Sequence, residues 1–244
     1  MDANQVFQLG PLQLPAAWII AAAGVLLATY ITEKMARKSG WEKEKWSDII
    51  ITAFIVFILT YKFGDGLIAF KQLIQNPEML LWSSGSPISL FLAIIFALIT
   101  LVYKVMKGNY RILEIIRLLW VFLSITIFIY HLFILDFGKT TTFFTGVSLE
   151  NQSQYLYHPI NWYKAVFIGI NLVIFYWMNS KKQDKINIFA FYLSLGTGLI
   201  ILSVFDISIH VYFGFTLEQI FYLLLGIVGV AGLFVYPEKE QTNV

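Results

Sequence analysis

Long apolar runs separated by short polar stretches dominate this chain. A helix that crosses a bilayer core about 30 Å thick needs roughly 20 mostly apolar residues. Seven runs reach or approach that length: Leu12–Ile31, Ile49–Phe70, Ile88–Met106, Ile112–Leu135, Tyr163–Met178, Ile186–Phe205 and Phe215–Tyr236. None of them alternates apolar and polar residues, as transmembrane β-strands do. The pattern predicts an all-α membrane protein with seven transmembrane helices.

The basic residues between these runs predict the orientation. One side carries Lys34, Arg37, Lys38, Lys43, Lys45, Lys104, Lys107, Arg111, Lys181, Lys182, Lys185 and Lys239. The other side carries Lys62, Lys71, Lys139 and Lys164, and Arg117 lies within a span. Lys and Arg are enriched in cytoplasmic loops. We therefore expect the N-terminus outside and the C-terminus in the cytoplasm.

Composition agrees with a membrane protein. Hydrophobic residues make up 58% of the 244 positions and charged residues 13%, with a mean hydropathy of +0.72. Soluble domains carry about 25% charged residues. The absence of cysteine excludes disulfides, thiolate nucleophiles and Cys-ligated metal sites. We expect a single transmembrane domain over residues 1–244, without a cleaved signal peptide or a nucleic-acid partner.

Two connections on the predicted outer side mix apolar and polar residues. They are residues 71–87 and 136–162. Irregular backbone cannot face lipid at depth, so such segments lie at the interface, inside protein or beside a wet cavity. We expect both to be interfacial segments at the outer face.

The stretch "FGKTTTFFTG", residues 137–146, has the chemistry of a phosphate site. Gly138 and Gly146 permit tight backbone, Lys139 supplies a cation, and Thr142 and Thr145 supply hydroxyls. A phosphate favours such charge-assisted hydrogen bonds, so the stretch suits a phospholipid head group. An ordinary interfacial loop is equally consistent with these residues.

The second polar stretch, "HPINWYK", begins at His158. Its His158, Asn161 and Tyr163 are placed to orient the same ligand, although no carboxylate adjoins His158 to form a dyad. The three histidines, His131, His158 and His210, are 27 and 52 residues apart, which matches no metal-ligand spacing. We expect no metal and no cofactor.

The order of short motifs resembles the prolipoprotein diacylglyceryl transferase family. "FQLGPLQL" is similar to its opening F-x-hydrophobic-G-P-hydrophobic, and "LTYKFGDGL" stands where the family has G-G-R-hydrophobic-G-Tyr. "GKTTTFFTG" resembles G-R-x-G-N-F-hydrophobic-N-G, and "HPINWYKA" resembles H-P-x-Q-L-Y-E-A. "GFTLEQIFYLLLGIVG" resembles the closing motif. The motifs keep the family's order over nearly the whole chain.

The resemblance implies a multi-pass protein of the bacterial cytoplasmic membrane that acts in lipoprotein biosynthesis. The family moves a diacylglyceryl group from phosphatidylglycerol to a prolipoprotein cysteine, so phosphatidylglycerol and prolipoproteins are the implied partners. The implied catalytic residues are His158 and Lys139. The implied head-group ligands are Lys62, Lys139, Thr142, Thr145, Asn161 and Tyr163, and the motif scaffold is Gly138, Gly146, Pro159 and Gln219.

The chain departs from the family at several reactive positions. Lys139 replaces the signature arginine and loses its bidentate fork. Ser89 stands where the family has a histidine, and Leu199 and Ser203 replace the Arg and Glu of a late motif. Removing one transition-state donor costs about 3 kcal/mol. Three readings remain open: a divergent transferase, a non-catalytic relative that binds phospholipid or a lipoprotein partner, and a small-molecule transporter.

Overall fold

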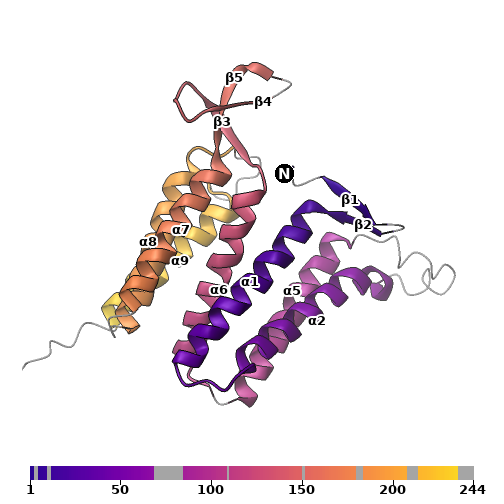
Figure 1. Ribbon diagram of the computed structural model, residues 1–244, viewed down its shortest axis with the longest axis vertical. Helices are drawn as coiled ribbons and strands as arrows, with labels where there is room; N and C mark the ends of the chain where they lie inside the picture. Colours follow the sequence, from indigo (N-terminus) through magenta and orange to yellow (C-terminus); the bar gives the residue numbers. More distant parts are fainter. Residues whose placement is uncertain are drawn as a thin grey trace, which may run out of the picture. The chain divides into compact units, whose positions relative to one another are not determined.

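A computed structural model describes residues 1–2, 5–9, 12–68, 85–108, 110–149, 152–179, 184–207 and 214–235 (Figure 1). The predicted interfacial segment 71–87, except for residues 85–87, lies outside the described residues, as does His210. The described chain forms two compact units. Unit 1 contains Met1–Gln5, Ala16–Gly24 and Ser124–Val244, and unit 2 contains Val6–Pro15 and Val25–Leu123.

Unit 2 is built around two paired helices. Helix α2 (Lys45–Ile68) packs on α5 (Pro87–Lys107). Strands β1 (Val6–Leu9) and β2 (Leu12–Pro15) form an antiparallel pair. Most of α1 (Ala16–Lys38) and the first half of α6 (Ile112–Phe133) complete the unit.

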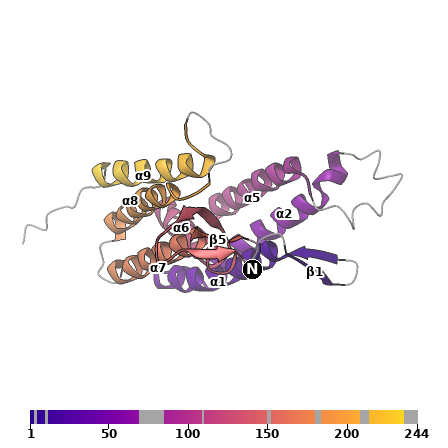
Figure 2. The same ribbon diagram turned by 90° about the horizontal axis from the view of Figure 1, so that it is seen from above.

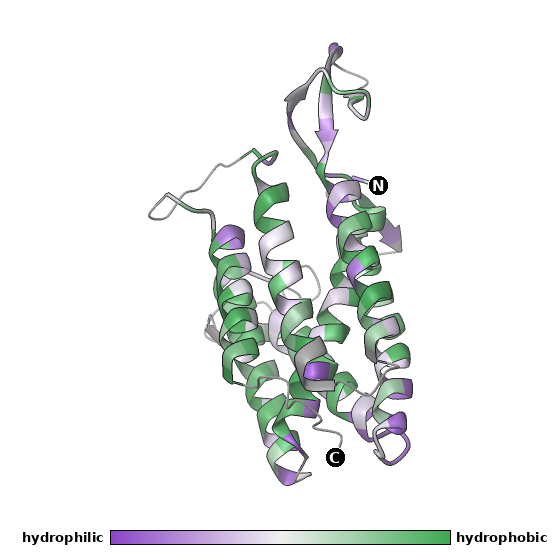
Figure 3. Ribbon diagram, turned by 90° about the vertical axis from the view of Figure 1, so that its left-hand side faces the viewer, coloured by the Kyte–Doolittle hydropathy of each residue, from purple (hydrophilic) through white to green (hydrophobic). Residues whose placement is uncertain are grey.

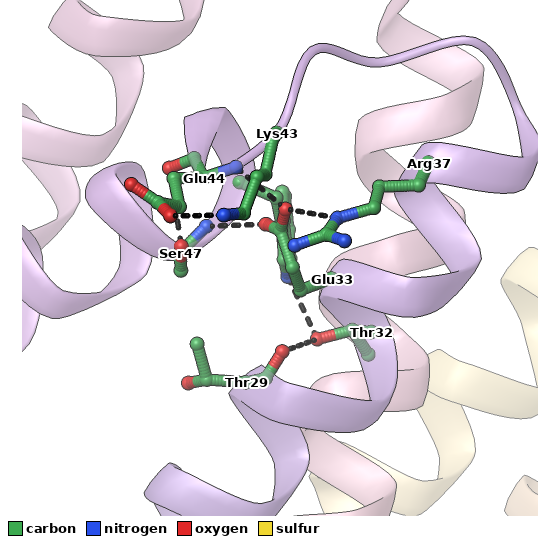
Figure 4. Close-up of polar contacts among 8 residues, drawn as sticks. Thr29, Thr32, Glu33, Arg37, Lys43, Glu44 and Ser47 are labelled. Atoms are coloured by element: carbon green, nitrogen blue, oxygen red, sulfur yellow. Dashed lines mark hydrogen bonds and ion pairs between the residues drawn. The ribbon is translucent and has the colours of Figure 1, made fainter.

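A buried carboxylate joins α1 to the start of α2 in this unit. Glu33 is 7% exposed and accepts hydrogen bonds from the backbone N–H groups of Glu44 (2.7 Å) and Ser47 (3.0 Å). It also accepts one from Nε of Arg37 at 3.2 Å (Figure 4). The first N–H groups of a helix have no partner within the helix and favour negative charge. Glu33 therefore caps α2 from a neighbouring helix.

Unit 1 contains three helices that lie side by side in both views (Figure 2). They are α7 (Ile160–Asn179), α8 (Asp184–Ser203) and α9 (Leu217–Val235), with α8 packed against the other two. Glycines let α8 and α9 approach closely. A Cβ on Gly196 would lie 2.4 Å from the backbone N of Gly226, and one on Gly229 would lie 2.4 Å from the backbone N of Leu193. Small residues at such contacts allow the dense packing that holds membrane helices together.

A three-stranded antiparallel sheet stands at one end of these helices. Its order is β3-β5-β4, with β3 (Phe137–Thr141), β4 (Val147–Leu149) and β5 (Gln152–Pro159). A register shift between Phe137 and Thr140 forms an irregularity in β3. β5 runs directly into α7, so the sheet lies at the N-terminal end of that helix.

Six described helices are long and apolar enough to cross a membrane: α1, α2, α5, α6, α7 and α9. In α8 the apolar part, Ile188–Ser203, is shorter. Phe91, Tyr103 and Met106 of α5 are each more than 60% exposed, as expected of side chains that face lipid. Figure 3 shows hydrophobic residues along the helices and hydrophilic ones gathered toward their ends. Six predicted spans are therefore confirmed as long apolar helices, while the seventh crossing and the orientation stay predictions.

The helices confirm the all-α class, and short strands occur beside them at two places. The first predicted span began at Leu12, but Leu12–Pro15 pairs with β1 and the helix begins at Ala16. Pro15 has extended backbone angles (φ −60°, ψ 140°) at the helix start. The predicted interfacial segment 136–162 contains the whole β3-β5-β4 sheet. Apolar content alone does not distinguish a short strand from a helix end.

Candidate functional site at the sheet end of unit 1

The end of β5 and the start of α7 bring three predicted site residues together. His158 is the next-to-last residue of β5, Tyr163 lies in the first turn of α7, and Thr145 lies in the turn between β3 and β4. The Tyr163 hydroxyl lies 2.5 Å from Oγ1 of Thr145 and 3.2 Å from Nδ1 of His158. All three side chains are half-buried. A phenol thus bridges an imidazole and an aliphatic hydroxyl.

Pro159 explains why the histidine and the tyrosine face each other. Proline cannot donate a backbone hydrogen bond, so it ends a strand and precedes a helix without loss. Pro159 is buried as the last residue of β5, and α7 starts at Ile160. The change from strand to helix brings Tyr163 back toward His158, and the ring centroids are 5.8 Å apart.

Strand β3 is fastened to the C-terminal end of α8. The backbone N–H of Lys139 donates to the carbonyl of Phe205 at 2.8 Å, and its ammonium donates to the carbonyl of Val204 at 2.8 Å. A Cβ on Gly138 would lie 2.2 Å from that same Phe205 oxygen. Only glycine permits so close an approach of two backbones. The strand irregularity places Gly138 and Lys139 opposite His158.

The ring of Phe205 covers one side of the hydrogen-bonded residues. Its centroid is 4.8 Å from the His158 ring and 6.4 Å from the Tyr163 ring. Phe205 is held in place by the two β3 contacts to the end of α8. The geometry of β3 therefore decides what lies beside the imidazole.

A second polar cluster joins residues of α7 and α9 to Asp206, which follows α8. Lys164 is 1% exposed, and its ammonium lies 2.9 Å from Oδ2 of Asp206 and 3.2 Å from Oε2 of Glu218. The Tyr222 hydroxyl donates to the same Glu218 oxygen at 3.3 Å. A buried ammonium needs such partners to offset its desolvation. The cluster joins α7 to the end of α8 and to α9.

The carboxylates of this cluster act on Asp136, which lies between α6 and β3. Partial burial raises the pKa of Asp136 above its ordinary value, and the carboxylates of Asp206 and Glu218 raise it further. The ammonium of Lys164 and the backbone N–H of Phe137 oppose this rise. The carbonyl of Asp136 accepts the backbone N–H of Asn161 at 3.4 Å.

The other predicted residues occupy varied places. Thr142 is exposed after β3. Asn161 is completely buried and donates to the carbonyl of His131 at 3.2 Å, and its Oδ1 accepts no hydrogen bond within the described part of the chain. Lys62 lies on α2 in unit 2, so its part in this site stays a prediction.

Two of the predicted scaffold residues hold tight local structure. Gln219 and Thr216 exchange hydrogen bonds across the first turn of α9, and Gln219 Nε2 donates to Oγ of Ser203 at 3.0 Å. This is a capping box tied to the end of α8. A Cβ on Gly146 would lie 2.7 Å from Cβ of Leu156, so the turn before β4 also requires a small residue.

Sequence reasoning missed Asp206 and Glu218 as partners of Lys164. One signal was available, because a lysine inside a predicted span requires a counter-ion. Both acidic residues fall at span ends on the predicted outer side, where such partners would be sought. Neither stands near Lys164 in sequence, so only the packing of α7, α8 and α9 selects them.

Ser89, which the motif comparison sets against a histidine of the transferase family, is a structural hydroxyl in unit 2. Ser89 is completely buried and donates to Oδ1 of Asp65 at 2.5 Å. Ser86 Oγ donates to the same oxygen and also accepts the backbone N–H of Ser89, capping α5. A Cβ on Gly64 would lie 2.7 Å from the Ser89 hydroxyl, so α2 packs directly on this residue.

The long apolar helices are those of a multi-pass membrane protein, and unit 1 carries a polar site at one end. No protein-family model matches the chain. A curated relative, the phosphatidylglycerol–prolipoprotein diacylglyceryl transferase of Clostridium tetani (strain Massachusetts / E88), is 24% identical over 205 residues. The match covers 80% of this chain and 82% of the relative. This distant similarity supports the resemblance seen in the sequence motifs.

Proposed function

We propose that the protein is a diacylglyceryl transferase-like membrane protein that handles phospholipid at the outer face of the bacterial cytoplasmic membrane. In its active form it moves a diacylglyceryl group from phosphatidylglycerol to the cysteine thiol of a prolipoprotein. The observation that carries this proposal is the hydrogen-bonded set of His158, Tyr163 and Thr145, with Lys139 on the adjacent strand. The distant similarity to a curated transferase, over 80% of this chain, supports it.

The reaction needs two things that these residues offer. A base must take the thiol proton, and donors or cations must hold the negative charge that develops on the departing phosphate. His158 is the base, and Thr145 and Lys139 stabilise the phosphate. Lys62, Thr142 and Asn161 are proposed as further head-group ligands.

A non-catalytic lipid-binding relative is the second candidate. This candidate is favoured because the two lysines near the site both bind protein groups, which leaves less positive charge for a phosphate. Lys139 donates to a carbonyl, and Lys164 is neutralised by two carboxylates. Under this reading the same residues bind a phospholipid or a lipoprotein partner without chemistry.

The deciding experiment is turnover by the purified protein in phosphatidylglycerol nanodiscs with a lipobox-cysteine peptide. Release of glycerol phosphate is measured, with an active prolipoprotein diacylglyceryl transferase as positive control. The transferase activity is supported if His158→Gln abolishes the release of glycerol phosphate and Lys139→Ala reduces it. The control Tyr155→Phe should release as much as the wild type. Absence of turnover while phosphatidylglycerol co-purifies supports the binding protein, and absence of both overturns the proposal.

A further inference from the structure

Two phenylalanine side chains are exposed side by side between β3 and β4. Phe144 is 89% exposed and Phe143 is 58% exposed, and their ring centroids lie 5.0 Å apart. Connections between strands usually carry small and polar residues. Two adjoining rings in water are unfavourable, because apolar surface gains free energy when it leaves water. A partner that covers the rings is therefore expected.

Local contacts hold the connection that carries the two rings, residues 142–146. The backbone N–H of Gly146 donates to the carbonyl of Phe143 at 2.9 Å, and the N–H of Phe143 donates to Oγ1 of Thr141 at 3.0 Å. A Cβ on Gly146 would lie 2.7 Å from Cβ of Leu156, so the connection packs closely on β5. The exposure of the rings is thus a property of a well-held backbone.

The connection is also tied to the start of α7. β3 and β4 pair with opposite edges of β5, so the chain between them passes from one edge of the sheet to the other. Within this passage Thr145 Oγ1 lies 2.5 Å from the hydroxyl of Tyr163, which is in the first turn of α7. Side chains of a helix lean toward its N-terminus, so the phenol reaches back to the level at which α7 begins. Phe144 adjoins Thr145 and therefore lies near that level.

The level at which α7 begins is a membrane boundary. Its residues Ile160–Met178 are long and apolar enough to cross a bilayer. Trp162, near the start of this span, is 57% exposed, and tryptophan is enriched at membrane–water interfaces. Further along the helix, Val166, Ile170 and Val173 are each more than half exposed. These side chains share one helix face and form the lipid-facing surface of α7.

Tyr163 belongs to this lipid-facing surface. It precedes Val166 by three positions and Ile170 by seven, and residues at these spacings lie on one side of a helix. The connection that is bonded to Tyr163 is therefore continuous with the surface that lipid covers. This continuity favours lipid as the partner of the two rings over a peptide or a second copy of the chain.

We propose that Phe143 and Phe144 insert into the head-group region of the bilayer at the sheet end of unit 1. Aromatic side chains are common at this depth in proteins that contact membrane interfaces. The rest of the sheet stands beyond the helix ends, in water (Figure 1). Gln154, for example, is exposed and lies five positions, or roughly 17 Å of extended strand, before Pro159 at the end of β5. The inference is independent of transferase activity, and it assigns the bilayer contact of segment 136–162 to one connection.

A single fluorescent label measures the depth, because the chain contains no cysteine. Phe144→Cys is labelled with bimane, and the full-length protein is reconstituted as one copy per nanodisc of phosphatidylglycerol and phosphatidylcholine. Lipids that carry a nitroxide test contact with the bilayer, and acrylamide tests contact with water. The expected result is strong quenching by a nitroxide near the head group, weaker quenching by one at the end of the acyl chain, and protection from acrylamide.

Two positions in unit 1 calibrate the label. Gln154→Cys should be quenched by acrylamide and not by nitroxide lipids, and Val173→Cys should be quenched most by the nitroxide at the end of the acyl chain. A label at position 144 that behaves like Gln154→Cys overturns the inference. Protection that appears only with two copies in a nanodisc, or only after an apolar signal-sequence peptide is added, assigns the rings to those partners and overturns it as well.

The role of the bond to Tyr163 is tested with the same label. Thr145→Val removes the hydroxyl, so quenching of the label at position 144 by head-group nitroxide should fall. The matched control is Thr142→Val, which changes an exposed threonine of the same connection and should leave the quenching unaltered. The label at Val173→Cys in the Thr145→Val background reports whether α7 still spans the bilayer. Unaltered quenching in Thr145→Val, with α7 in place, overturns the argument that Tyr163 sets the depth of the rings.

Discussion

The ammonium of Lys164 lies 2.9 Å from the carboxylate of Asp206 and 3.2 Å from that of Glu218. Lys164 is 1% exposed, while the side chains of Asp206 and Glu218 are 21% and 63% exposed. The cation is therefore the desolvated member, and the carboxylates remain in contact with the surroundings. Removing the two kinds of partner should have unequal consequences.

Loss of both carboxylates leaves a buried ammonium without a counter-ion. The double variant Asp206→Asn/Glu218→Gln is expected to lower the free energy of unfolding by about 3–5 kcal/mol, the cost of breaking a buried ion pair. Lys164→Met should cost less, because the stranded carboxylates stay partly solvated. Combining all three substitutions should recover most of the loss. Thermal unfolding in detergent measures the series, and additive effects of the three changes would contradict the coupling.

Close backbone contact between β3 and α8 predicts a second outcome. Gly138→Ala places a Cβ 2.2 Å from the Phe205 carbonyl, which must push β3 away and break the Lys139–Phe205 hydrogen bond. We expect a lower melting temperature and altered packing around His158. Gly226→Ala is the matched control, because a Cβ there meets nothing within 4 Å. It should be neutral or stabilising by about 0.5–1 kcal/mol, since alanine favours a helix over glycine. Equal effects of the two substitutions would refute this reading.

A third prediction concerns Glu33, whose carboxylate caps α2. Glu33→Gln keeps the shape but loses the charge that accepts two backbone N–H groups and Arg37. The expected cost is about 1–2 kcal/mol, as for loss of a helix cap or a charged hydrogen bond. Glu42→Gln removes only an exposed ion pair with Lys45, so its effect should stay below about 0.5 kcal/mol. Denaturation in detergent compares the free energies of unfolding of the two variants. If Glu33→Gln costs no more than Glu42→Gln, Glu33 does not cap α2.

Asp136 predicts a dependence on pH. Its pKa is raised in the folded protein, so protonation favours the folded state. This stabilisation is complete below the unfolded pKa of about 4 and is lost as pH rises through the higher folded pKa. Asp136→Asn stays neutral and should remove the decline. Its melting temperature should match the wild type in acid and exceed it at neutral pH, and a constant difference across pH would contradict the assignment.

The apolar runs located the helices well, because each helix that crosses a membrane must itself be long and apolar. Six predicted spans coincide with long apolar helices, with boundaries shifted by a few residues. The strands were missed because each is short, and because β3 gains its hydrogen bonds from β5, which lies beyond β4 in the sequence. Thr141, for example, pairs with Leu156 in β5.

The residue types of the site were also readable, but their connections were not. His158, Tyr163 and Thr145 were each singled out from polar stretches at the end of a span. That one phenol joins the other two depends on how the turn after β3 folds back on α7. Lys164 was noticed without its partners, and the Asn161 side chain lies inside unit 1 against the His131 carbonyl.

The sequence by itself therefore determined the class of protein, the helical spans and the polar chemistry near one end of them, since hydropathy and residue type are local properties. Only the tertiary structure decided which polar groups meet, because the bonds that Tyr163, Lys164 and Lys139 make across the site join residues from different elements. Thr145 reaches Tyr163 across 18 positions, Lys164 reaches Glu218 across 54, and Lys139 reaches Val204 across 65. Such pairings depend on how the strands and helices pack together, which no single segment specifies.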